Sequence, residues 1–214
     1  MSGRPYIILG GGGHAKVLYW ALIDSAKQVL GFIDREAKDA LILGTGLRYL
    51  GNDDDLKRYP PSEVFLVNGI GSVKNTKPRQ DIYNRFREMG FEFPAVVHPS
   101  AIIGKDCSLG MGSQIMAGVV IQTGCKIGEN CIVNTRACID HDCVIGDHSH
   151  IASGAVISGH VETGSGVHIG AGATVIQCLK VGSHSVVGAG SVVIRNVAEN
   201  IVVAGTPART IRQS

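Results

Sequence analysis

Residues 127–156 read IGENCI VNTRAC IDHDCV IGDHSH IASGAV, and every block of six begins with Ile or Val. This register runs from Ile103 to residue 198, sixteen hexads without an insertion, and Thr163 is the single first position that is not Ile, Leu or Val. Such a repeat is typical of a parallel β-helix, in which each hexad forms one short strand and a corner. Three hexads close a triangular coil of 18 residues, so we expect a β-helix over residues 99–214.

The fifth hexad position holds a small side chain in nearly every repeat, and four of the six cysteines lie there. These side chains are expected to point inward beside the Ile and Val column, so the cysteines are predicted to be buried and inert. This weighs against Cys143 as a nucleophile. Cys138 and Cys178 lie at other positions of the hexad, and neither has the spacing of a metal ligand.

Residues 1–98 follow a different pattern. Apolar runs at 6–10, 31–34 and 64–70 read as buried strands, and residues 14–25 and 77–89 have helical spacing. Strands alternating with helices predict a small α/β domain with a parallel sheet.

Composition narrows the function. The chain has 214 residues with 29 glycines and 5% aromatics, which suits a thin, regular core. A net charge of +2 is too small to favour nucleic-acid binding. No apolar run approaches the roughly 20 residues that cross a bilayer, and we expect no signal peptide at residues 1–16, where the apolar run is too short. We therefore expect a cytoplasmic protein without a membrane partner.

Four glycines precede the first expected helix, in GGGGHA at residues 10–15. They match the GxGxxA fingerprint of dinucleotide-binding folds, but fewer than 100 residues cannot form both halves of such a fold. A half-Rossmann-like domain that holds one nucleotide diphosphate is the better interpretation, and a purely structural glycine turn is the alternative. The residues expected to bind this nucleotide are Gly12, Gly13, His14, Asp34, Arg35, Asn68 and Gly69.

A polar segment interrupts the uniform repeat at residues 133–150. His141 occupies a corner position between Asp140 and Asp142, and a histidine beside a carboxylate supplies a base near neutral pH with a fixed tautomer. A solvated corner is the alternative interpretation. We expect His141 to be a catalytic base.

The hexapeptide array, the IDHDCVIGDHSH segment (139–150), GAGATV (170–175), VGAGSVV (187–193) and the closing VAGTPAR (203–209) resemble bacterial nucleotide-sugar acetyltransferases. The most similar group is the two-domain sugar N-acetyltransferases of the bacillosamine and perosamine pathways, with their sialic-acid O-acetyltransferase relatives. The resemblance covers essentially the whole chain, including GGGGHAK (10–16) and GFIDRE (31–36).

The resemblance implies a left-handed β-helix, a homotrimer and acetyl-CoA as co-substrate, with no metal. It implies that His141 is the general base and Asp142 its orienting neighbour, although the family often has Glu at that position. It also implies an acetyl-CoA site at His150, Gly170, Ala171 and Ala189. The acceptor would be a nucleotide-linked 4-amino sugar, a GDP-linked one being favoured.

Transfer is expected to be direct, with the backbone N–H of Asp142 or Cys143 as the nearest oxyanion donor. His141 and His150 are nine residues apart, half a coil, so within one chain they should lie on opposite sides of the prism. If both serve one thioester, the active site must lie between subunits.

Several alternatives stay open at this point. A sialic-acid-type O-acetyltransferase and an N-acetyltransferase for UDP-linked amino sugars would use the same residues. A zinc-dependent γ-type carbonic anhydrase shares the β-helix, although the histidine spacings here do not match its pattern. A non-catalytic nucleotide-sugar sensor would bind the nucleotide without transferring an acetyl group.

Overall fold

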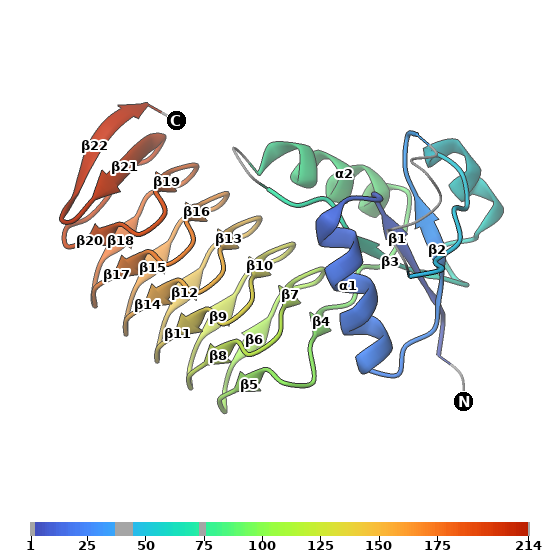
Figure 1. Ribbon diagram of the computed structural model, residues 1–214, viewed down its shortest axis with the longest axis horizontal. Coiled ribbons are helices and arrows are strands. Elements are labelled where there is room, and N and C mark those ends of the chain that lie inside the picture. The colour runs from blue at the N-terminus through green and yellow to red at the C-terminus, as the bar shows by residue number, and fades with distance from the viewer. Residues whose placement is uncertain (1–2, 37–44, 73–75, 214) are drawn as a thin grey trace.

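The computed structural model describes residues 3–36, 45–72 and 76–213. An α/β domain lies against one end of a long stack of coils (Figure 1). The domain consists of β1 (Tyr6–Leu9), α1 (Gly13–Asp24), β2 (Val29–Ile33), the 3-10 helix η1 (Asp53–Arg58), β3 (Phe65–Asn68) and α2 (Lys77–Glu88). Its three strands are parallel in the order β2-β1-β3.

All four residues of β1 are buried, because helices cover both faces of the sheet. Ile8 packs with Leu18 and Leu22 of α1, whereas Ile7 packs with Phe86 of α2 on the other face. Alternation along the strand produces this division. The strand and helix positions predicted from the apolar runs are confirmed.

Parallel strands of two residues then form the coils, one strand per hexad. Face 1 contains β4 (Val96–Val97), β7 (Gln114–Ile115), β10 (Ile132–Val133), β13 (His150–Ile151), β16 (His168–Ile169) and β19 (Val186–Val187). Face 2 contains β5 (Ile102–Ile103), β8 (Val120–Ile121), β11 (Cys138–Ile139), β14 (Val156–Ile157), β17 (Thr174–Val175) and β20 (Val192–Val193). Face 3 contains β6 (Ser108–Leu109), β9 (Lys126–Ile127), β12 (Val144–Ile145), β15 (Glu162–Thr163) and β18 (Lys180–Val181).

A hairpin closes the far end of the stack, where β21 (Ile201–Gly205) continues face 1 and pairs with the last strand, β22 (Ala208–Gln213). The parallel stack itself begins at β4, so its first strand precedes residue 99. The predicted fold class, a small α/β domain followed by a left-handed β-helix, is confirmed.

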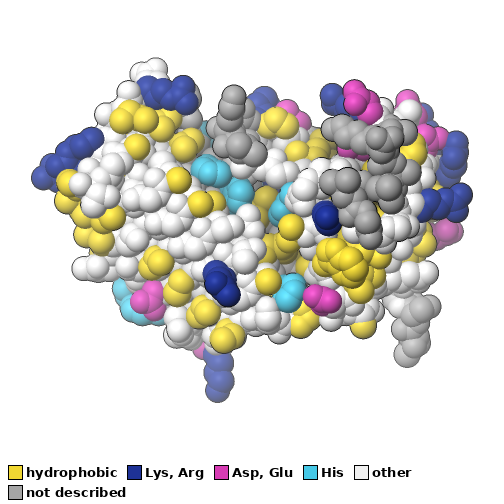
Figure 2. All heavy atoms as spheres, viewed as in Figure 1, with side chains coloured by type: hydrophobic (Ala, Val, Ile, Leu, Met, Phe, Trp, Pro, Cys, Tyr) yellow, Lys and Arg dark blue, Asp and Glu magenta, His cyan; other side chains and the backbone are white. Residues whose placement is uncertain are grey.

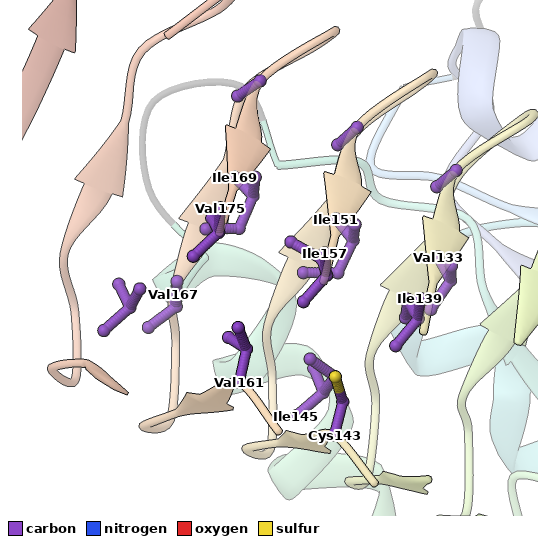
Figure 3. Close-up of a cluster of buried hydrophobic side chains, with 14 of the residues drawn as sticks. Val133, Ile139, Cys143, Ile145, Ile151, Ile157, Val161, Val167, Ile169 and Val175 are labelled. Atoms are coloured by element: carbon purple, nitrogen blue, oxygen red, sulfur yellow. The ribbon is translucent and has the colours of Figure 1, made fainter. Parts of the chain in front are cut away.

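The interior of the prism is a stack of equivalent side chains, one layer per coil (Figure 3). Val133, Ile151 and Ile169 lie above one another on face 1. Cys143 and Val161 fill fifth positions and are fully buried. Burial raises the pKa of the Cys143 thiol to about 12, which leaves almost no thiolate near neutral pH. The expectation of an inert Cys143 therefore has a physical basis.

Polar contacts join the α/β domain to face 1 and to the corner that precedes β10. The His14 ring lies 2.7 Å from Gln114 Oε1. Asn68 Nδ2 donates to Asn130 Oδ1 over 3.4 Å, and Arg79 Nε donates to the Asn130 carbonyl over 3.3 Å. Figure 2 shows histidine side chains gathered where the two parts meet. These hydrogen bonds fix the orientation of the domain on the prism.

The other two faces differ in what they present to solvent. The outward residues of face 2 are mostly apolar: Ile102, Val120, Cys138, Val156, Thr174 and Val192. Ile102 is 65% exposed, which is unusual for an isoleucine. Face 3 instead presents charges and carries an ion pair between Lys180 and Glu162. In the described part of the chain, neither α1 nor α2 is long and apolar enough to cross a membrane.

Candidate active site

His141 and Asp142 occupy the corner between β11 on face 2 and β12 on face 3. His141 Nδ1 lies 2.9 Å from Asp142 Oδ2. An ionised carboxylate can only accept a hydrogen bond, so Nδ1 carries the proton and Nε2 carries the lone pair. The hydrogen bond to Asp142 also raises the pKa of His141 above its usual value. This tautomer can accept a proton at Nε2.

The ring of His141 rests on the next coil. A Cβ atom at Gly159 would lie 2.7 Å from both Cε1 and Nε2 of His141, so the ring occupies space that any other residue would fill. His160 stands beside it, with Nε2 3.6 Å from Asp142 Oδ2 and its ring perpendicular to that of His141. Two residues of the following coil thus border the predicted base.

The backbone N–H groups after His141 are engaged in the coil. Asp142 N–H donates to the Thr123 carbonyl over 3.0 Å. The N–H of Cys143 interacts with the Cys125 thiol inside the prism. The backbone of Cys143 stays the predicted oxyanion donor, but it would have to exchange this inward contact for the thioester oxygen.

His150 lies far round the coil from His141, on face 1, which is opposite the corner between faces 2 and 3. Its Nδ1 is 2.7 Å from Ser72 Oγ and 3.1 Å from the Ser72 carbonyl, and Asn134 Nδ2 donates to Nε2 over 3.4 Å. Burial lowers the pKa of His150 to about 3, so the ring is neutral. The ring of His168, one coil further, packs against its edge.

The other predicted acetyl-CoA residues lie at the corner between faces 1 and 2. Ala171 and Ala189 occupy the same position in successive coils, linked by the hydrogen bond from Gly190 N–H to the Ala171 carbonyl. Both alanines are exposed and carry only a methyl group. Gly170 stacks tightly on the next coil, where a Cβ would lie 2.5 Å from Ala189 N. The result is a shallow, smooth path along the prism.

A cavity of about 490 Å³ lies at the carboxyl ends of the strands in the α/β domain. Asp34 and Arg35, which follow β2, border one side of it. Asp53 of η1 and Arg85 of α2 border it too and form an ion pair with each other. Ligands of open α/β sheets bind at this edge.

The glycine turn lies between β1 and α1, and its members differ in accessibility. Gly12 and Gly13 face open space, so a ligand can approach their backbone. Gly11 N–H already donates to Asp34 Oδ2 over 2.7 Å. His14 turns away to Gln114, and burial lowers its pKa to about 4.

Two further predicted residues after β3 face inward. Asn68 is buried and donates to the Arg79 carbonyl. A Cβ at Gly69 would lie 2.7 Å from the Leu9 carbonyl, so close packing requires glycine there. The structure thus gathers Gly12, Gly13, Asp34 and Arg35 at the open edge of the sheet, whereas His14, Asn68 and Gly69 serve the junction with face 1 or the packing of the domain.

Sequence reasoning missed several residues beside these sites. His160 follows Asp142 by one coil of 18 residues, so the repeat itself could have placed it there. Gly159 could be found by the same count. Asp53 and Arg85 carry no such signal, because Asp53 lies on η1 in an irregular connection and meets Arg85 of α2 only in the folded domain.

Two family models match parts of the chain. The PglD N-terminal domain matches residues 6–86, and the bacterial transferase hexapeptide (six repeats) matches residues 124–159. No curated protein matches the chain.

Solved structures match nearly its whole length. PerB from Caulobacter crescentus, in complex with CoA and GDP-perosamine, is 33% identical with a TM-score of 0.88, and the match covers 97% of each chain. A second structure from the same organism, with the same ligands, is that of the H141N mutant of perosamine N-acetyltransferase. It is 32% identical with a TM-score of 0.89, and the match covers 97% of this chain and 96% of that one.

The acetyltransferase domain of PglB from Neisseria gonorrhoeae, in complex with acetyl coenzyme A, is 31% identical with a TM-score of 0.91. That match covers 98% of this chain and 100% of the other.

Proposed function

The chain belongs to the hexapeptide-repeat sugar acetyltransferases with a PglD-type N-terminal domain, which use acetyl-CoA as co-substrate. We propose that it acetylates the amino group of a nucleotide-linked 4-amino-dideoxy sugar, and GDP-perosamine is the favoured acceptor. The family resemblance seen in the sequence is confirmed, as is the activity of a sugar N-acetyltransferase. The base, the exact acceptor and the assembly belong to the proposal.

The observation that carries the mechanism is the His141–Asp142 pair. Asp142 holds the Nδ1 proton, and Nε2 of His141 has no hydrogen-bond partner among the described residues. Both side chains are about half exposed at the corner, where a substrate can reach them.

In the proposed reaction the sugar amine attacks the thioester carbonyl carbon while His141 Nε2 takes a proton from the nitrogen. A C–N bond forms, and the C–S bond breaks as the tetrahedral intermediate collapses. The imidazolium then gives its proton to the departing CoA thiolate. The buried, protonated Cys143 thiol takes no covalent part.

The test is a panel of UDP-, GDP- and CMP-linked amino sugars and their hydroxyl counterparts, assayed with acetyl-CoA. We expect the fastest release of CoA thiol with a GDP-linked 4-amino sugar. Faster transfer to a hydroxyl would favour the O-acetyltransferase alternative. Nucleotide binding without any transfer would favour the sensor.

The cavity in the α/β domain supports a guanine nucleotide. Guanine presents two neighbouring donors, N1–H and the 2-amino group, beside the acceptor O6; this edge is complementary to a carboxylate next to a guanidinium. Asp53 and Arg85 supply such a pair, and Asp34 is already bound to Gly11. Uracil has one donor between two carbonyl oxygens, so the second carboxylate oxygen would face an acceptor.

Replacing Asp53 with Asn should therefore weaken GDP binding by roughly tenfold, the effect of losing one good bidentate contact to a base. UDP binding should change little, because the contact of uracil N3–H with one carboxylate oxygen is offset by the carbonyl that faces the other oxygen. Isothermal titration of both nucleotides measures the ratio. Asp54→Asn is the matched control, since Asp54 lies on the same 3-10 helix and pairs with Lys57 outside the cavity. Tighter binding of UDP than GDP by the wild-type protein would contradict this assignment.

Face 2 supports a homotrimer. Its outward residues are mostly apolar and uncovered, whereas face 1 holds the α/β domain and face 3 carries charges. A second copy of the chain would bury this face, and a rotational arrangement that closes after three subunits brings unlike surfaces together. His141, at the edge of face 2, could then approach His150 on face 1 of the neighbour.

This shared-site model predicts complementation between defective subunits. His141→Asn and His150→Ala proteins should each be nearly inactive, and mixed trimers should regain part of the activity because some interfaces hold both wild-type histidines. The measurement is transfer rate after subunit exchange, with exchange verified by native mass spectrometry of differently tagged chains. No recovery in verified mixed trimers would show that each subunit works alone.

A further inference from the structure

Two histidines and one carboxylate meet at the corner between faces 2 and 3, and the reaction as proposed uses only two of them. His141 Nδ1 and His160 Nε2 lie 2.9 and 3.6 Å from Asp142 Oδ2. One donor atom from each residue lies within 4.8 Å of the other two. His160 has no part in acetyl transfer, so the cluster calls for its own explanation.

The coil repeat produces this cluster. His160 occupies the position of Asp142 one coil later, and its N–H donates to the His141 carbonyl over 3.0 Å. Asp142 and His160 share a left-handed backbone, with φ of 59° and 57°, so their side chains leave the corner in the same direction. Hydrogen-bonded strands lie about 4.8 Å apart, which keeps the two side chains within reach of one ion.

Two imidazole nitrogens and a carboxylate oxygen form a donor set that suits zinc and similar divalent transition metals, whereas magnesium and calcium take oxygen ligands. Donors around a tetrahedral zinc ion lie about 3.4 Å apart, given bonds of about 2.1 Å. The side chains of His141, Asp142 and His160 are 48, 49 and 58% exposed, so movements of about 1 Å meet little resistance. Water can complete the coordination.

We propose that His141, Asp142 and His160 form an inhibitory zinc site. Coordination through His141 Nδ1 moves the ring proton to Nε2, and coordination through Nε2 occupies the lone pair directly. In either case the neutral ring has no lone pair left to accept a proton from the sugar amine. Zinc is here an inhibitor and not a cofactor. The inhibition rests on the proposed role of His141, whereas zinc binding depends on the geometry alone.

The experiment titrates the chelator-treated full-length protein with zinc sulfate against a chromophoric zinc chelator and measures acetyl transfer in parallel. Acetylated sugar is quantified by mass spectrometry, because zinc also binds the thiol of CoA. The variant is His160→Asn, which suits the left-handed backbone. His184→Asn is the matched control: His184 is an exposed histidine with φ of 58° at a different corner, outside the cluster.

We expect the wild-type and His184→Asn proteins to bind zinc with equal affinity and to lose at least about 90% of their transfer rate at saturation. His160→Asn should bind zinc at least about tenfold more weakly. A correspondingly higher zinc concentration should then be needed to lower its transfer rate below the rate of the same variant without metal. Equal zinc affinity of wild type and His160→Asn would overturn the site.

Transfer that continues in the zinc-saturated wild type would overturn the inhibition. If His141→Asn were fully active in the same assays, that failure would belong to the proposed base, because the binding titration does not depend on catalysis. Hydration of CO₂ by the zinc-loaded protein would overturn the inhibitory role and favour the carbonic anhydrase alternative.

Discussion

Replacing His141 with Asn is expected to lower turnover by about two to four orders of magnitude, the usual contribution of a positioned general base. The asparagine amide has no basic nitrogen to take the proton from the sugar amine, because its nitrogen lone pair is delocalised into the carbonyl group. Affinity for CoA and for the nucleotide should change little, because neither ligand is expected to depend on the imidazole. Steady-state rates together with titration calorimetry separate the two effects.

Asp142→Asn provides the graded comparison. Asn accepts the left-handed backbone at this position and can keep a hydrogen bond to the ring, but it no longer carries the charge that fixes the tautomer. We expect a smaller loss than for His141→Asn. A His141→Asn enzyme within a few-fold of the wild type would remove His141 from the mechanism.

Gly159→Ala is expected to lower turnover by roughly a hundredfold, although Gly159 touches no substrate in the proposed reaction. The added Cβ would lie 2.7 Å from Cε1 and Nε2 of His141, so the ring must move. Misplacement of a reacting group by about 1 Å can cost this much. No left-handed φ is required at Gly159, so alanine does not strain the backbone. Melting temperature and ligand affinities should stay close to those of the wild type.

The double variant shows whether the ring is the cause. In the His141→Asn background, Gly159→Ala should produce almost no further loss, because the displaced imidazole is already gone. If the two losses instead multiply, Gly159 acts through something other than His141. A crystal structure of Gly159→Ala would show the rotated ring directly.

The sequence predicted the fold almost completely because each hexad repeats the same local structure, a short strand followed by a corner. An Ile, Leu or Val at nearly every sixth residue specifies strand, corner and face at once, so sixteen strands follow from one rule. The α/β domain was predicted from apolar runs and helical spacing, and its strands and helices begin within two residues of the expected positions.

The site was harder to predict where tertiary contacts decide the direction of a side chain. His14 belongs to a glycine fingerprint, yet it turns to Gln114, which is 100 residues away. No local pattern could reveal that face 1 offers a partner there. Asp53 and Arg85 likewise meet beside the cavity only through the tertiary fold, so no local pattern pairs them. His160, in contrast, was accessible from the 18-residue count.

The uninterrupted register of the coils also limits how such a chain can change its length during evolution or engineering. A six-residue insertion between Val144 and His150 would carry every later strand to the next face, a third of a turn away. His150 would leave the surface that meets the α/β domain. An insertion of 18 residues adds one whole coil and returns each later residue to its own face. Length is therefore free to vary only in whole coils, and preferably beyond the coils that hold both histidines.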